Sequence, residues 1–147
     1  MLRNILSVFV GVLFGALVVF VIEMAGHVLF PPPTDIDLKD PAQLRAAMAQ
    51  IPVGAKLLVV AGWFLGAFAG CALTSVLSRR WAPAVWVVAA TMTLFVASTL
   101  MAIPHPWWMM IAGLLASPIA GYLAVKATGA RYGAPPDGRP RDPIAGL

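Results

Sequence analysis

Residues 5–29 read ILSVFVGVLFGALVVFVIEMAGHVL, and Glu23 and His27 are the only ionisable side chains among them. About 20 consecutive apolar residues are enough for a helix to cross the hydrocarbon core of a bilayer. The stretch is longer than the ~7–15-residue apolar core of a signal peptide, and no A-x-A-like cleavage site follows it. We therefore interpret it as a retained membrane-spanning helix that ends before Pro31.

Three further stretches have the same apolar character, at residues 54–77, 82–103 and 107–127. Only 11% of the whole chain is charged, whereas soluble domains carry about 25% charged residues. Lipid offers no hydrogen-bond partner to the backbone, so each stretch should be helical, and period-2 alternation typical of a barrel is missing. The sequence predicts an all-α integral membrane protein, a four-transmembrane-helix bundle forming a single transmembrane domain over residues 1–128.

The segment 31–53 between the first two spans predicts a short amphipathic helix over about 41–51. Asp40 suits a helix cap, Pro41 suits the first helical position, and Gln43 completes a capping box. This helix is expected on the outer membrane surface, either as a simple cap or as a lid or partner-binding element. Residues 129–147 are rich in Gly, Pro, Asp and Arg, which predicts a disordered cytoplasmic tail.

The basic residues cluster at the ends of the expected helices, which indicates membrane orientation and not nucleic-acid binding. Seven of them lie at the end that holds the termini and three at the opposite end. The positive-inside rule then predicts that both termini are in the cytoplasm. The simple four-span chain without eukaryotic targeting motifs is consistent with a bacterial inner-membrane protein. The seven are Arg3, Arg79, Arg80, Lys126, Arg131, Arg139 and Arg141, and the three are Lys39, Arg45 and Lys56.

Small residues recur at spacings of four in three of the expected spans. Such residues let helix backbones approach closely in lipid, where van der Waals packing drives association. The pattern predicts glycine-zipper contacts, either inside the bundle or across a homodimer or larger membrane complex. The residues are Gly11, Gly15, Gly62, Gly66, Gly70, Gly113, Ser117 and Gly121.

Glu23 is the acidic residue of the expected spans, and an ionisable group at that depth marks a functional site by default. His27 lies four residues later, on the same helix face. His105 lies in the turn between the last two spans, and counting residues places it above the level of Glu23. These three side chains form the candidate proton, ion or metal site. Supporting side chains at neighbouring levels are Trp63, Ser98, Thr99, Met24, Met101 and Met109.

Three hypotheses for this cluster remain open from the sequence. Glu23 fixes helix register, protonated or hydrogen-bonded to His27, Trp63, Ser98 or Thr99. Alternatively, the cluster serves a small proton- or cation-coupled transporter. As a third option, His27 and His105 bind copper or haem with nearby methionines, since thioether and imidazole suit copper(I).

No nucleotide-binding, hydrolase or metalloprotease motif is present, so the sequence favours a protein that is not an enzyme. The single cysteine, Cys71, lies in an apolar run and is expected to be a packing residue. The predicted function is a non-enzymatic accessory or scaffold component that acts through helix–helix contacts. The alternative is a transporter or a metal- or haem-binding membrane protein that uses Glu23, His27 and His105.

Overall fold

The computed structural model describes residues 2–31 and 40–133, and its regular elements are all helices. Four of the five helices are long and apolar enough to cross a membrane, which confirms that part of the predicted fold class. The first span begins three residues before its predicted start at Ile5. In chain order the helices are α1 (Leu2–Leu29), α2 (Pro41–Gln50), α3 (Val53–Leu77), α4 (Ala82–Ala102) and α5 (Trp107–Thr128).

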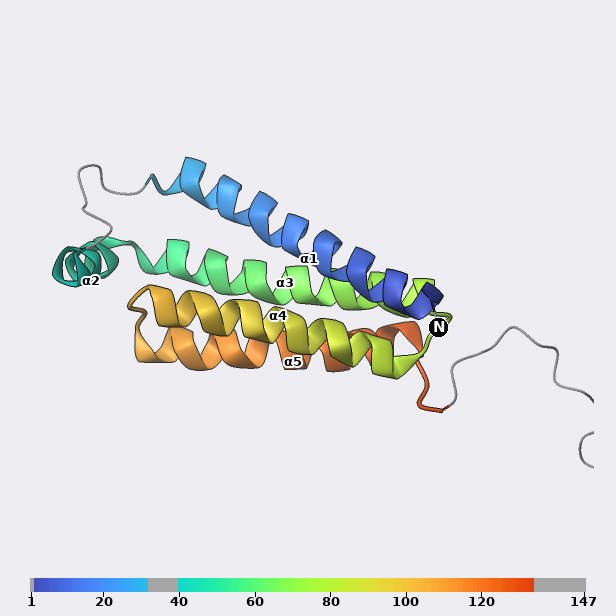
Figure 1. The fold of residues 1–147 in the computed structure, drawn as a ribbon. Coiled ribbons are helices and arrows are strands. Elements are labelled where there is room, and N and C mark those ends of the chain that lie inside the picture. The colour runs from blue at the N-terminus through green and yellow to red at the C-terminus, as the bar shows by residue number, and fades with distance from the viewer. Residues whose placement is uncertain (1, 32–39, 134–147) are drawn as a thin grey trace, which may run out of the picture.

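The four long helices form an elongated bundle in which α3 packs against α1, α4 and α5 (Figure 1). Helix α1 also packs against α4, and α4 against α5, whereas α1 makes no close backbone approach to α5. Helix α1 begins and α5 ends at the same end of the bundle, and α2 lies beyond the other end (Figure 1). We call the latter the α2 end.

Helices α1 and α3 make their closest approach in the half of the bundle away from the α2 end. A Cβ added at Gly70 would lie 2.5 Å from the carbonyl oxygen of Gly11, and one added at Gly15 would lie 2.7 Å from that of Gly66. These contacts are between backbones, so only glycine allows them. Towards the α2 end, α1 leans away from α3 (Figure 1), and Gly26 faces the flexible end of Leu58 instead.

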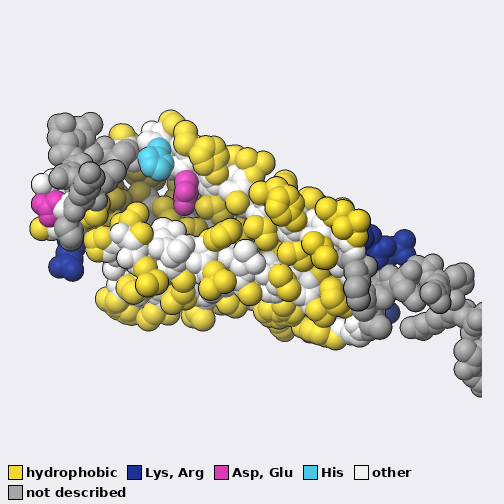
Figure 2. Space-filling model, viewed as in Figure 1, with side chains coloured by type: hydrophobic (Ala, Val, Ile, Leu, Met, Phe, Trp, Pro, Cys, Tyr) yellow, Lys and Arg dark blue, Asp and Glu magenta, His cyan; other side chains and the backbone are white. Residues whose placement is uncertain are grey.

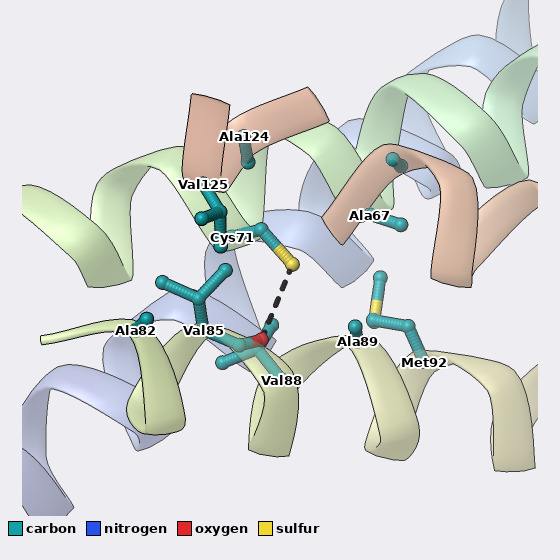
Figure 3. Packing of buried hydrophobic residues seen from close by; sticks show 10 residues of the cluster. Ala67, Cys71, Ala82, Val85, Val88, Ala89, Met92, Ala124 and Val125 are labelled. Carbon is teal, nitrogen blue, oxygen red and sulfur yellow. Dashed lines mark hydrogen bonds between the residues drawn. The ribbon is translucent and has the colours of Figure 1, made fainter. Parts of the chain in front are cut away.

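The best-buried core lies where α3, α4 and α5 meet near the end opposite α2. Cys71 of α3 is fully buried there and donates its S–H to the carbonyl oxygen of Val85, with 3.5 Å between the atoms (Figure 3). Gly121 of α5 lies against Ala89, where an added Cβ would be 2.8 Å from the alanine methyl group. The cysteine is thus a packing residue in a dense core of small side chains.

The turn between α3 and α4 is held by the chain that follows α5. Arg79 and Arg80 both have left-handed backbone conformations, with φ of 55° and 62°. The backbone N–H of Arg131 donates to the carbonyl of Arg80 over 2.8 Å, and the indole of Trp81 donates to the carbonyl of Gly133 over 2.9 Å. Residues 129–133, assigned from sequence to the disordered tail, therefore lie against this turn. Residues 134–147 of that segment lie outside the described part of the chain.

Helix α2 begins as the capping pattern of the sequence suggests. The side chain of Asp40 accepts a hydrogen bond from the backbone N–H of Ala42 over 2.8 Å, and Pro41 occupies the first turn. The axis of α2 runs across the bundle axis (Figure 1). Its backbone approaches none of the other helices closely, so α2 borders the space at this end without filling it.

Candidate functional site

A cavity of about 460 Å³ lies at the α2 end, where α1 has leaned away from α3. In Figure 2 the surface is hollowed at this end, and an acidic and a histidine side chain lie beside the hollow on an otherwise apolar face. A volume of this size is typical of small-molecule sites, which combine apolar walls with a few polar groups. The ionisable side chains that line it are Glu23, His27, Lys56 and His105.

A second, smaller cavity of about 200 Å³ lies among α1, α3, α4 and α5. Glu23, Trp63 and Thr99 line both cavities, so the two adjoin at these side chains. We call the combined space the lateral cleft, because it opens between α1 and α4 on the side of the bundle. Glu23 lies where the two cavities adjoin.

The carboxylate of Glu23 is partly buried and has no hydrogen-bond or ion-pair partner among the described residues. The Nδ1 of His27 is hydrogen-bonded to the backbone carbonyl oxygen of Glu23, 2.7 Å away, and not to the Glu23 carboxylate. The hydroxyls of Ser98 and Thr99 both donate to the carbonyl of Phe95. Among the described residues, the carboxylate of Glu23 thus makes none of the side-chain hydrogen bonds to His27, Ser98 or Thr99 that one form of the register-fixing hypothesis names.

Lys56 is the second ionisable group of the cleft that lacks a partner among the described residues. It lies in the first turn of α3 and is only 8% exposed. Helices α1 and α3 run in opposite directions, with Phe30 of the chain after α1 against Gly54 and Gly26 of α1 against Leu58. This pairing puts His27 at about the same level along the bundle as Lys56. Glu23 then lies about one helical turn, or roughly 5–6 Å, deeper along the bundle. The lysine side chain is thus mostly buried, and its ammonium keeps contact with accessible space in the cavity, which singles out Lys56 as a group that can meet a ligand there.

His27 and His105 both line the cavity. The Nδ1 of each ring is hydrogen-bonded to a backbone carbonyl nearby in the sequence. The Nδ1 of His105 is 2.6 Å from the carbonyl oxygen of Ile103, and its ring centroid is 6.1 Å from that of Trp63. Within residues 2–31 and 40–133, no three histidine, cysteine or acidic side chains gather as a metal site would require. The two histidines therefore offer hydrogen-bonding groups on the wall of the cavity.

The supporting residues divide into two groups in the structure. Trp63, Thr99 and Met109 line the cleft, and Trp63 and Met109 are almost fully buried. Ser98 is exposed, Met24 and Met101 are 49% and 89% exposed, and none of these three lines either cavity. Equal level along the bundle does not place a side chain inside it, because the direction of the side chain depends on how each helix is rotated.

Ser117 is a polar cleft residue that the sequence assigned to helix packing alone. It is fully buried, its Oγ has no hydrogen-bond partner, and it lines the smaller cavity. Hydroxyls in helices usually donate to a carbonyl three or four residues earlier, as Thr91, Thr93 and Thr99 do here. Lys56 enters the sequence prediction as one of the three basic residues of the outer end and not as a site residue. Its position four residues after Pro52, inside the first turn of a span, was the available signal.

Comparisons with known proteins identify no relative of this chain. No protein-family model matches the chain, and neither the curated proteins nor the solved structures contain a match.

Proposed function

We propose that this chain is a four-span inner-membrane protein that binds a lipid-like amphiphile in its lateral cleft, with Glu23 as a polar anchor. The observation that carries the proposal is the unpartnered carboxylate at the junction of two cavities, on the side of an apolar bundle. An ionisable residue facing a cavity at this depth is expensive and is retained for function by default.

The apolar lining of the cleft favours an amphiphile over a free ion. Ile22, Phe30, Leu58 and Val59 line the larger cavity together with the polar groups. Helix α1 forms one wall, and only three of its 28 residues are buried. An acyl chain on the α1–α4 side would thus meet apolar surface, while its polar end reaches the carboxylate.

The proposal includes the orientation expected from the basic residues. Arg3, Arg79, Arg80 and Lys126 lie at the end opposite α2, and Arg45 belongs to α2. With the positive end in the cytoplasm, the larger cavity lies in the outer leaflet and α2 at the outer surface. Both chain termini are then cytoplasmic.

The test is the lipid that remains bound to the full chain after mild detergent extraction, read by native mass spectrometry. Ala55 lines the larger cavity, whereas Ala61 lies on the exposed side of the same helix. Ala55→Trp fills the cleft and should lose the lipid adducts that the natural chain carries. Ala61→Trp adds the same bulk outside the cleft and should keep them. Identical adduct patterns in all three proteins would refute binding in the cleft.

A second candidate function is the scaffold role, and the poor burial of α1 favours it. Its exposed face carries Ile5, Phe9, Leu13, Leu17 and Phe20, which suit a partner helix as well as lipid. Glu23→Gln separates the two candidates, because the amide keeps hydrogen-bonding capacity but loses charge. A scaffold tolerates the change and still assembles with its partners, whereas amphiphile binding through the carboxylate weakens.

A further inference from the structure

The lateral cleft contains two opposite charges that do not pair with each other. The Glu23 carboxylate and the Lys56 ammonium both line the larger cavity, and neither has an ion-pair partner among the described residues. Lys56 is 92% buried, and Glu23 lies about one helical turn deeper. A charge on the wall of a largely apolar cavity is stabilised by a partner of the opposite sign, so the two groups together suit a ligand that carries both charges.

We infer that the cleft recognises a zwitterionic headgroup of the ethanolamine phospholipid type, with the phosphate on Lys56 and the primary ammonium on Glu23. The inference rests on the proposed function, since it names the class of amphiphile that the same cleft binds. A phosphate joined to an ammonium by two carbons carries both required charges in one group. The lysine lies nearer the α2 end, where the bilayer interface and the lipid phosphates are in the proposed orientation.

The chemistry of the two side chains separates this lipid from the other common classes. A glycerol headgroup satisfies Lys56 but leaves Glu23 without a cation. A choline headgroup supplies a cation without N–H donors, so the carboxylate gains no charge-assisted hydrogen bond. His27, level with Lys56, and His105 add hydrogen-bonding groups to the same wall.

The experiment titrates the full chain in detergent with ethanolamine, glycerol and choline phospholipids of identical acyl chains, and reads binding by native mass spectrometry. We expect the ethanolamine lipid to bind about tenfold more tightly than the other two, since a hydrogen bond to a buried charge typically supports a difference of that order. Glu23→Gln should abolish the preference over the glycerol lipid while leaving glycerol-lipid binding intact. Lys56→Met should weaken the binding of both the ethanolamine and the glycerol phospholipid.

The controls keep the result interpretable. Lys126→Met removes an exposed lysine at the opposite end of the bundle and should change nothing. Water-soluble phosphoethanolamine, added as a competitor, should not displace the lipid, because it lacks the acyl chains; displacement would assign the site to a soluble ligand instead. Lack of labelling at buried Cys71 shows that each variant is folded.

Two failures point to different conclusions. Equal affinity for the three phospholipids would overturn the zwitterion inference and leave amphiphile binding in place. Absence of any bound lipid in the natural chain would overturn the proposed function and the inference together.

Discussion

At the scale of single residues, several polar groups of the spans join helices by hydrogen bonds, and others line the cleft without a partner. Thr74 donates its hydroxyl to the carbonyl of Ser7 on α1, 3.1 Å away, and Ser75 pairs with Thr128 over 2.7 Å. These bonds join helices at the end opposite α2. Glu23, Lys56 and Ser117 lack partners among the described residues and line the lateral cleft, whereas the buried Oδ1 of Asn4, which also lacks a partner, lies at the opposite end. Interhelical hydrogen bonds thus gather at the end opposite α2, and the two unpaired ionisable groups of the spans lie on the walls of the cleft.

Ser117 gives a prediction at this scale. Since its buried hydroxyl has no partner, Ser117→Ala removes a desolvation cost and should stabilise the lipid-free protein by about 1 kcal/mol. The change in stability is measured by thermal unfolding in detergent, monitored through the maleimide labelling of Cys71 as it becomes exposed. Ser75→Ala is the matched control, and it should destabilise because it breaks the pair with Thr128. A loss of stability in Ser117→Ala would mean that the hydroxyl binds water or a ligand in the cavity.

At the scale of helices, the angle between α1 and α3 creates the cleft. Glycines bring the two backbones into contact at Gly11 and Gly70, whereas larger side chains separate them at the α2 end. Ile22 lies against Gly62, and Leu58 lies against Gly26. Close contact at one end and side chains between the helices at the other produce the divergence seen in Figure 1.

Substitutions of these glycines should therefore have unequal effects. Gly70→Ala puts a methyl group 2.5 Å from the Gly11 carbonyl oxygen, which cannot move without shifting α1. Overpacking of this kind costs about 1–3 kcal/mol. Gly26→Ala meets only the flexible end of Leu58 at 3.1 Å, so its stability should change little. Thermal unfolding of the two variants compares them directly, and equal losses would contradict the backbone-contact argument.

At the scale of the whole molecule, the arrangement is a compact three-helix unit of α3, α4 and α5 with α1 attached along one side. Buried residues are numerous in those three helices, but α1 contributes only Ser7, Gly11 and Gly15. The cleft lies at the border between the two parts. Helix α1 is held to α3 by close backbone contact in the half of the bundle away from α2, and its other faces bury few side chains. Lateral entry of a lipid would therefore use the α2 end, where α1 diverges from α3 (Figure 1).

The proposed orientation gives the whole-molecule prediction. Cys71 is fully buried, so the natural chain should not react with a membrane-impermeant maleimide and serves as its own control. Arg45→Cys, on exposed α2, should be labelled from the outside of intact cells. Arg131→Cys, exposed at the opposite end, should be labelled only after permeabilisation. The reverse pattern would invert the topology and move the cleft to the inner leaflet.

The sequence alone determined the number of long helices and their character, because crossing a hydrocarbon layer imposes a length and an apolar composition that single stretches reveal. It also singled out Glu23, since an ionisable group is conspicuous in such a stretch. It left open whether Met24, Met101 and Ser98 share a site with Glu23, and it did not identify Lys56 and Ser117 as residues that line the same cleft.

Those questions depended on the tertiary structure. Helix rotation decides whether a side chain points into the bundle, and in lipid the apolar residues surround each helix, so periodicity in the sequence does not reveal it. The divergence of α1 from α3 depends on which glycines meet, as Gly11 meets Gly70 and Gly15 meets Gly66. Only that pairing leaves a cavity at the α2 end and places Glu23 and Lys56, 33 residues apart in the sequence, on its walls.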